Sequence, residues 1–208
     1  PAFQGIYRSL AQVRSVEPSL NTLYKDLKNF KSKITPKDEN RLKFKRNITL
    51  KNIFYQYPNS TKIVLNNLNL NISVSSKIGI VGATGSGKTT IVDIILGLLE
   101  LQQGFLEVDG KLIEKNNLRT WQNSIGYVPQ NIFLADDTVS ANIAFGVENN
   151  SINKQDVENA AKIASLHDFV INELPEKYQT YIGEKGIRLS GGQRQRIGIA
   201  RALYHNPK

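Results

Sequence analysis

Cysteine and methionine are both absent from this chain of 208 residues, and tryptophan occurs only once. Without cysteine the chain can form no disulfide, no thiolate metal site and no cysteine nucleophile. No stretch approaches the roughly 18 consecutive apolar residues that a membrane-crossing helix needs. The first ten residues, PAFQGIYRSL, lack the basic-then-apolar order of a signal peptide. Because the sequence also begins without methionine, we expect it to be part of a longer protein.

Aromatic residues are scarce as well, at 8% of the chain, whereas positive charge is in excess, with a net charge of +9. A basic protein can bind nucleic acid or an acidic membrane surface. No basic stripe interleaved with aromatic residues accompanies the charge, however, so we expect no nucleic-acid partner. Much of the excess lies in residues 25–46, and we interpret residues 31–46 as a charged, solvated linker. Anionic lipid head groups would tolerate such a segment beside a membrane.

Residues 1–30 carry apolar side chains at the three- and four-residue spacing of a helix. Phe3, Ile6 and Leu10 begin this pattern, and it restarts at Leu20 after Pro18. Pro18 is therefore expected either to kink one helix or to open a second one. The apolar stripes need a partner surface, since otherwise they would face water.

The character of the sequence changes near residue 47, where alternating apolar residues predict β-strands. Strands are expected at 48–57, 64–74 and, as a tight hairpin turning at Asp109-Gly110, within 104–113. Two short apolar segments, 77–82 and 124–130, are expected to be buried strands. Helices are expected at 89–99, 153–174 and 191–204. This order of elements predicts one mixed α/β domain over residues 47–208.

The segment GATGSGKTT fits the phosphate-binding pattern G-x-x-x-x-G-K-[ST] at Gly82, Gly87, Lys88 and Thr89. Glycines let successive backbone N–H groups point at phosphate oxygens, and the following helix adds its positive end. A glycine-rich turn without a ligand is the alternative, but the predicted strand before it and helix after it favour nucleotide binding. The expected binding residues are Gly82, Ala83, Thr84, Gly85, Ser86, Gly87, Lys88, Thr89 and Thr90.

A second glycine motif, LSGGQ at residues 189–193, opens the last predicted helix about a hundred residues further along. Ser190 can cap the helix, and Gly191 and Gly192 allow an anion to approach the backbone. An ordinary serine-capped helix is the alternative for this pentapeptide alone. Together with the first motif it indicates a second phosphate-binding helix end, formed by Ser190, Gly191, Gly192 and Gln193.

With these two motifs, residues 47–208 resemble the nucleotide-binding domain of ABC transporters. The resemblance implies a P-loop NTPase core of ABC ATPase type, with an antiparallel β subdomain and a helical subdomain, preceded by an N-terminal helical extension. It also implies that ATP and Mg²⁺ bind, that Lys88 and Gln130 have catalytic roles, and that Thr89 and Gln130 ligate the metal. Tyr57 matches the aromatic residue that stacks on adenine, although it could equally be a core or strand-edge tyrosine.

Two further stretches, Asp136–Gly146 and Gly183–Gly186, are similar to the exporter branch of the family. Residues 1–30 would then be the cytoplasmic end of the last transmembrane helix and its connector. This region looks most like flippases of lipids and lipid-linked oligosaccharides. The resemblance implies a protein at the cytoplasmic face of the inner cell membrane, as part of an integral membrane protein.

The family mechanism implies two partners, a second nucleotide-binding domain paired head to tail and the transmembrane domains of the same transporter. The family's Walker B strand, catalytic glutamate and switch histidine have no counterpart in these residues, so we expect the 208 residues alone to hydrolyse ATP negligibly. A soluble ABC ATPase acting on nucleic acid or ribosomes is the alternative from another class. A non-catalytic half-site in a heterodimer also remains open.

Overall fold

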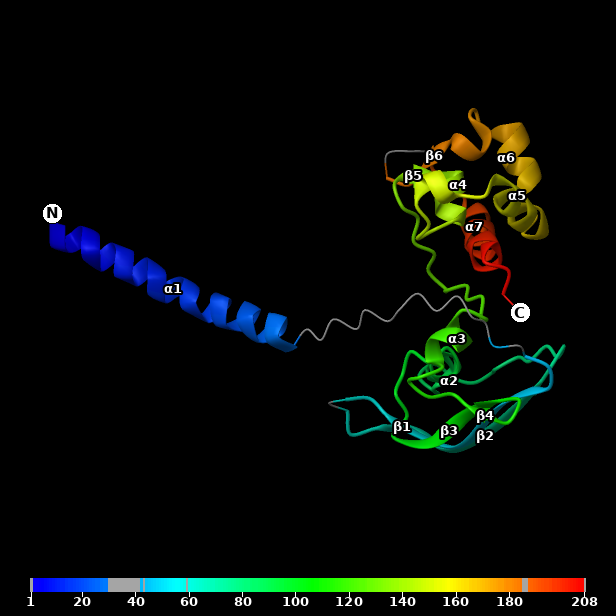
Figure 1. Ribbon diagram of the computed structural model, residues 1–208, viewed down its shortest axis with the longest axis horizontal. Coiled ribbons are helices and arrows are strands. Elements are labelled where there is room, and N and C mark those ends of the chain that lie inside the picture. Colours follow the sequence, from blue (N-terminus) through cyan, green and yellow to red (C-terminus); the bar gives the residue numbers. More distant parts are fainter. Residues whose placement is uncertain (1, 30–41, 43, 59, 185–186, 208) are drawn as a thin grey trace. The chain divides into compact units, whose positions relative to one another are not determined.

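The computed structural model describes residues 2–29, 42, 44–58, 60–184 and 187–207, which fall into two compact units, residues 1–38 and 39–208 (Figure 1). The described residues of the first unit form one helix, α1 (Ala2–Asn29). This helix runs through Pro18 without a break, so the expectation of a second helix starting there is wrong. A proline ring removes only one backbone donor, and around it the Thr22 hydroxyl donates to the Pro18 carbonyl at 2.9 Å.

The apolar side chains of α1 are exposed to solvent within the part of the chain that the structure describes; Phe3, for instance, is 88% exposed. None of the described helices combines the length and the apolar composition that a membrane crossing requires. The charged linker expected at 31–46 lies mostly outside the described residues.

The second unit begins with a four-stranded antiparallel sheet in the order β2-β1-β3-β4 (Figure 1). Its strands are β1 (Asn47–Gln56), β2 (Ile63–Ser73), β3 (Gln103–Val108) and β4 (Lys111–Leu112). Asp109 and Gly110 join the last two with positive φ angles of 54° and 82°, as a two-residue type I′ hairpin requires. The three strand regions and the hairpin predicted from sequence periodicity are therefore confirmed.

One face of this sheet is apolar and packs on two helices, α2 (Lys88–Ile95) and α3 (Leu118–Gln122). Trp121 of α3 is 3% exposed, and its indole N–H donates to the Ile95 carbonyl at 2.7 Å. The hydrogen bond satisfies the indole inside an apolar cluster, as a buried tryptophan needs. The buried residues of this sheet core are Leu50, Ile53, Tyr55, Leu65, Ile91, Ile94, Leu106, Val108 and Trp121.

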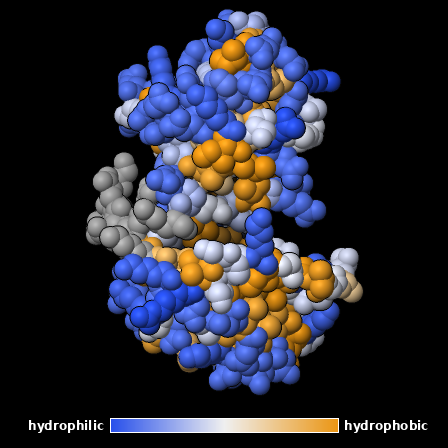
Figure 2. Space-filling model, turned by 90° about the vertical axis from the view of Figure 1, so that its right-hand side faces the viewer, coloured by the Kyte–Doolittle hydropathy of each residue, from blue (hydrophilic) through white to orange (hydrophobic). Residues whose placement is uncertain are grey.

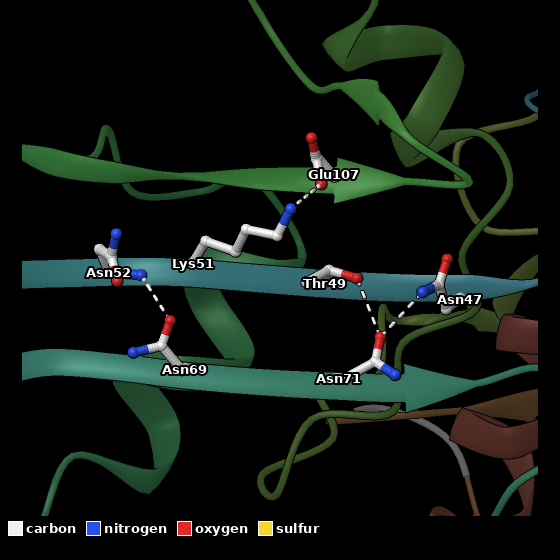
Figure 3. Close-up of polar contacts among 7 residues, drawn as sticks. All are labelled: Asn47, Thr49, Lys51, Asn52, Asn69, Asn71 and Glu107. Carbon is white, nitrogen blue, oxygen red and sulfur yellow. Dashed lines mark hydrogen bonds and ion pairs between the residues drawn. The ribbon is translucent and has the colours of Figure 1, made fainter.

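The opposite face of the sheet is polar and bonded to itself (Figure 3). The Asn71 side-chain oxygen accepts from Asn47 Nδ2 at 3.0 Å and from Thr49 Oγ1 at 2.9 Å. Lys51 and Glu107 form an ion pair at 3.1 Å across β1 and β3. This alternation of apolar and polar faces sets the register of the strands, because a one-residue slip would exchange the two faces.

The end of the segment interpreted as a linker is attached to the domain. The Asp109 carboxylate accepts hydrogen bonds from the backbone N–H groups of Lys45, Arg46 and Asn47 at 2.6, 2.7 and 2.9 Å. The Leu42 N–H donates to the Ser124 hydroxyl at 2.8 Å. Residues 42 and 44–46 therefore belong structurally to the sheet region.

A helical region follows, with its own core (Figure 1). It contains the short antiparallel pair β5 (Asp137–Thr138) and β6 (Tyr181–Ile182) and the helices α4 (Val139–Ile143), α5 (Lys154–Ile163), α6 (His167–Glu173) and α7 (Gly191–Tyr204). Two single-turn 3₁₀ helices, η1 (Asn149–Ser151) and η2 (Lys177–Gln179), complete it. The helices expected at 153–174 and 191–204 are confirmed, the first as two helices, because Ser165 between them has a positive φ of 53°.

The two short buried strands expected at 77–82 and 124–130 are wrong for this structure. Neither segment pairs with a strand among the described residues, and Val81 is 92% exposed. Apolar strands of this kind become buried only between hydrogen-bonded neighbours and under helices on both faces. Without such neighbours the two segments remain outside the sheet, although Ile80 and Ile125 still pack against its core. Figure 2 shows hydrophobic residues open at the surface of the molecule.

Candidate functional site

The loop between residue 82 and α2 has the geometry of a phosphate cradle. Gly85 and Gly87 take positive φ angles of 79° and 91°, which glycine adopts without strain. Lys88 starts α2, and its ammonium group donates to the carbonyl oxygens of Gly82 at 2.9 Å and Ala83 at 2.8 Å. The loop therefore curls around its own lysine, as a ring of backbone groups next to the positive end of a helix.

Close packing of the loop on β2 explains why residue 87 is a glycine. A Cβ at this position would lie 3.0 Å from Leu65 and 3.1 Å from Val64 of β2. The loop thus sits directly on the antiparallel sheet. Contact at this distance ties the start of α2 to β2, which fixes the direction in which the helix dipole points.

Thr89 and Thr90 have different environments although they are adjacent. Thr89 is exposed at the start of α2, where its hydroxyl can reach a bound ion. Thr90 is 4% exposed, and its hydroxyl lies 3.0 Å from the Tyr57 hydroxyl. The Tyr57 ring packs edge to face on Tyr55, with 5.1 Å between centroids. The structure therefore joins Tyr57, which is 38% exposed, to Thr90 of the glycine-rich motif.

Magnesium would have to bind through hydroxyl, amide and phosphate oxygens here. In the described part of the chain, no group of three or more His, Cys, Asp or Glu side chains could hold a metal. Gln130 is exposed at the end of the 124–130 segment. The Thr89 hydroxyl and the Gln130 side-chain carbonyl are each an oxygen donor of the kind that Mg²⁺ prefers, and Mg²⁺ keeps several waters or phosphates in its shell.

The LSGGQ segment forms a complete capping box at the start of α7. The Ser190 hydroxyl accepts from the Gln193 N–H at 3.2 Å, and the Gln193 side chain accepts from the Ser190 N–H at 2.7 Å. A capping box satisfies two of the backbone donors that a helix start leaves unpaired. Gly191 and Gly192 are exposed, with no atom within 4 Å of where a Cβ would lie. Their backbone is open to an incoming anion.

Sequence reasoning missed two polar contacts that organise these regions. It did not connect Tyr57 with Thr90, because the two residues are 33 positions apart. It also did not single out Asn142, which is fully buried in α4 and bonded to Arg201 of α7. An asparagine between apolar residues was the only available signal in the second case.

A comparison with known protein families decides what this pair of glycine motifs belongs to. The family model described as "ABC transporter" matches residues 65–208, which is more than half of the chain. The chain belongs to the ABC transporter family. The resemblance found in the sequence is thereby confirmed, as is the ABC ATPase fold with its antiparallel sheet and its helices.

Curated relatives of this ABC transporter chain include ATP-dependent lipid A-core flippases and ATP-binding cassette proteins of sub-family B. It is 43% identical over 162 residues to the ATP-dependent lipid A-core flippase of Saccharophagus degradans, covering 78% of this chain and 27% of that protein. It is 40% identical over 162 residues to human ATP-binding cassette sub-family B member 5, covering 77% of this chain and 13% of that protein. The chain thus spans about a quarter or less of these relatives.

A solved structure gives the same answer at the level of the fold. The structure of a bacterial Atm1-family ABC exporter with ATP bound superposes with a TM-score of 0.77 at 29% sequence identity, covering 94% of this chain and 34% of that one. The alternative of a soluble ABC ATPase is not favoured, because the relatives include lipid A-core flippases and the solved structure is that of an ABC exporter.

Proposed function

We propose that this chain is the ATP-binding part of a membrane exporter and works as a pair of domains. The observation that carries the proposal is the pairing, in one chain of this family, of a curled phosphate loop with an open, capped helix start at Gly191. Each feature binds an anion at backbone N–H groups. Two such sites in one domain suit a nucleotide shared between two copies.

Within one copy, we assign each cradle residue a part in holding the nucleotide. The backbone from Gly82 to Thr90 surrounds the phosphates, and the Lys88 ammonium moves from its carbonyl partners to the β- and γ-phosphates. The Tyr57 ring supports the base by stacking. Mg²⁺, held by Thr89 and Gln130, would neutralise charge on the transferred phosphate.

The second copy supplies the other half of the site. Ser190 and the backbone at Gly191 and Gly192 would face the γ-phosphate held by the partner's loop, with Gln193 keeping Ser190 in place. ATP binding then favours the closed pair because each nucleotide joins two surfaces, and hydrolysis removes the shared phosphate.

We infer that the exporter moves a lipid-like substrate, such as a lipid or a lipid-linked oligosaccharide, across the membrane. Support comes from the curated relatives that are ATP-dependent lipid A-core flippases. The domain would sit at the cytoplasmic face of the inner membrane. Residues 1–30 would then join it to the transmembrane domains, and the exposed apolar side chains of α1 would contact neighbouring helices.

The test uses the full-length protein that contains this chain, reconstituted in lipid vesicles. Lys88→Ala removes charge-assisted hydrogen bonds worth about 1.5–3 kcal/mol, so ATP should bind roughly 10- to 100-fold more weakly. Movement of a fluorescent lipid between leaflets should stop as well. Lys77→Ala, an exposed lysine just before the loop, serves as the control and should change neither quantity. Unchanged ATP affinity and lipid movement in Lys88→Ala would contradict the proposed function.

A further inference from the structure

Asn142 is the polar centre of the helical region. Its side chain is fully buried, and its oxygen accepts from the Ala135 N–H at 2.9 Å. Its amide nitrogen donates to the carbonyl oxygens of Ala135 and Thr138, both at 3.0 Å. One amide therefore closes the loop that leads into α4. A buried amide with all its hydrogen bonds made rigidifies its surroundings, because opening the loop would leave polar groups unpaired.

Arg201 connects Asn142 to α7, which we call the signature helix because it begins at the LSGGQ motif. It lies in the last turn of α7, the helix that starts at Gly191. Its Nε donates to the Asn142 carbonyl at 2.8 Å, and a terminal nitrogen donates to the Asn142 side-chain oxygen at 3.3 Å. The guanidinium group also lies 4.6 Å from the centre of the Phe145 ring. A planar, forked donor suits this double contact, which a lysine cannot reproduce.

A second connection joins the loop that leads into α4 to the part of the chain just before the LSGGQ motif. Strand β5 pairs with β6, with Asp137 opposite Ile182 and Thr138 opposite Tyr181. At Gly183 a Cβ would lie 2.9 Å from the Ala135 carbonyl oxygen, so the two backbones touch. The segment from Ala135 to Phe145 thus contacts the chain both before and after the LSGGQ motif. One contact is at Ile182, eight residues before Ser190, and the other is at Arg201, eleven residues after it.

Apolar packing brings the two helices together, and the hydrogen bonds add direction to this contact. Val139 and Ile143 of α4 share one core with Ile197 and Ala200 of α7, but such contacts are not directional. The hydrogen bonds of Asn142 fix one relative position of the two helices. Burial lowers the pKa of Arg201 from its ordinary value, and the partly buried guanidinium is compensated by the oxygens of Asn142 and the ring of Phe145.

We propose that Asn142 and Arg201 are positioning residues that lock the signature helix α7 to the segment from Ala135 to Phe145, so that the two move as one body. The inference rests on the proposed function, in which the nucleotide of a second copy engages Ser190 and Gly191. Movement of that helix end is then passed directly to Phe145, whose side chain is 47% exposed.

The experiment measures whether this body stays rigid in the full-length protein. Spin labels at Asp136 and Gln195, both exposed, report the distance between the loop and α7; this part of the protein contains no cysteine to interfere. In the otherwise unchanged protein the distance distribution should be the same with and without MgATP. In Arg201→Gln it should broaden, since both hydrogen bonds from the guanidinium are lost. A distance that changes on adding MgATP to the unchanged protein would overturn the proposal.

A kinetic readout separates positioning from simple loss of structure. Arg201→Gln should keep the Kd for ATP near that of the unchanged protein but lower ATP turnover roughly two- to thirtyfold, the range of long-range coupling. Arg196→Gln is the matched control on the same helix, since Arg196 donates to the Ser165 carbonyl at 3.1 Å; it should alter neither distance nor turnover. Arg201→Lys keeps the positive charge, so its ATP turnover and distance distribution should lie between those of Arg201→Gln and Arg196→Gln.

The outcomes are distinct from those of the Lys88 test. If Arg201→Gln does not fold, Arg201→Lys carries the measurement, and a distance distribution and turnover equal to the unchanged protein would overturn the inference. Absence of ATP turnover in the unchanged protein would instead contradict the proposed function. The distance measurement alone would then test whether α7 and the segment from Ala135 to Phe145 are locked together.

Discussion

Asp109 illustrates, at the scale of single residues, how one side chain can fix two segments. It forms the first position of the β3–β4 turn, and its carboxylate holds the backbone before β1. Burial acts to raise the pKa of Asp109, but hydrogen bonds from the Asn47, Lys45 and Arg46 backbones and the charge of Arg46 outweigh it and lower the pKa. The charged carboxylate is therefore the form that the folded protein prefers.

This preference predicts a pH-dependent effect of Asp109→Asn. A lowered pKa in the folded state stabilises the protein above the ordinary value of 3.8, and this stabilisation disappears as pH falls through the lower, folded value. Asparagine tolerates the positive φ of the turn but is uncharged. Urea unfolding should therefore show the variant less stable at pH 7, with the difference shrinking in acid. A difference that is independent of pH would contradict this account.

Two glycines with similar φ angles should respond differently to alanine. At Gly104, with φ at 85°, a Cβ would collide with the backbone of Lys51 and Asn52, at 2.5 Å from the Asn52 oxygen. At Gly110, with φ at 82°, nothing lies within 4 Å. Gly110→Ala should cost about 1 kcal/mol for the left-handed conformation alone. Gly104→Ala should cost about 3 kcal/mol or more, because backbone must also move. Chemical unfolding of both variants measures the difference, and equal losses would argue against the clash.

At the scale of elements, the sequence predicted what local periodicity controls. Alternation found β1 and β2, the Asp109-Gly110 pair found the hairpin, and the Ser190 cap placed the start of α7. It did not find β5 and β6, which are two residues each and exist only because residues 137 and 182 meet. The segments 77–82 and 124–130 failed for a related reason. Their apolar composition suits a buried strand, but a strand also needs neighbours that no local pattern can supply.

The binding residues divide in the same way. Motifs name Lys88 and Ser190 because phosphate binding needs those residue types at fixed spacing. Asn142 and Arg201 carry no such spacing, since they are 59 residues apart and meet only through the packing of α4 on α7. A single sequence therefore reveals the atoms that would touch a ligand more readily than those that align them.

Helix α7 permits a test that separates its cap from its ligand. Ser190→Ala removes the side-chain cap and should cost about 1 kcal/mol of stability. Ser190→Asp retains an oxygen that can accept from the Gln193 N–H, so stability should stay near the unchanged value. Its negative charge would, however, repel a phosphate of the second copy. In the full-length protein, thermal unfolding and ATP-dependent pairing should therefore respond differently to the two changes. Normal pairing in Ser190→Asp would contradict the assigned role of Ser190.

At the scale of the whole domain, most of the buried apolar residues that the structure describes fall into two clusters. One lies under the sheet around Leu50 and Trp121, and the other fills the helical region around Leu166 and Ile197. Residues sharing a core tend to unfold together, whereas separate cores can open independently. Two clusters therefore favour two cooperative units in residues 39–208.

The single tryptophan makes this division measurable. Trp121 belongs to the sheet cluster and is 3% exposed, so its fluorescence reports the sheet core. Within residues 39–208, far-UV circular dichroism reports the helical region more strongly, because α5 and α7 are longer than α2 and α3; the signal of α1 (Ala2–Asn29) is left out by measuring protein that begins at residue 39. We expect the two signals to change at different urea concentrations, which violates two-state behaviour. Superimposable curves would instead indicate one cooperative unit.

The lysine of the phosphate loop gives nucleotide capture a particular character. An ammonium group has three N–H donors, and at Lys88 two of them already point at the oxygens of Gly82 and Ala83. Capture is then an exchange of partners, from neutral carbonyl oxygens to negatively charged phosphate oxygens, which bind an ammonium group more strongly. A triphosphate can replace both hydrogen bonds that Lys88 gives up, whereas a ligand with one phosphate replaces them only in part. The loop would thereby bind triphosphates in preference to monophosphates before any hydrolysis takes place.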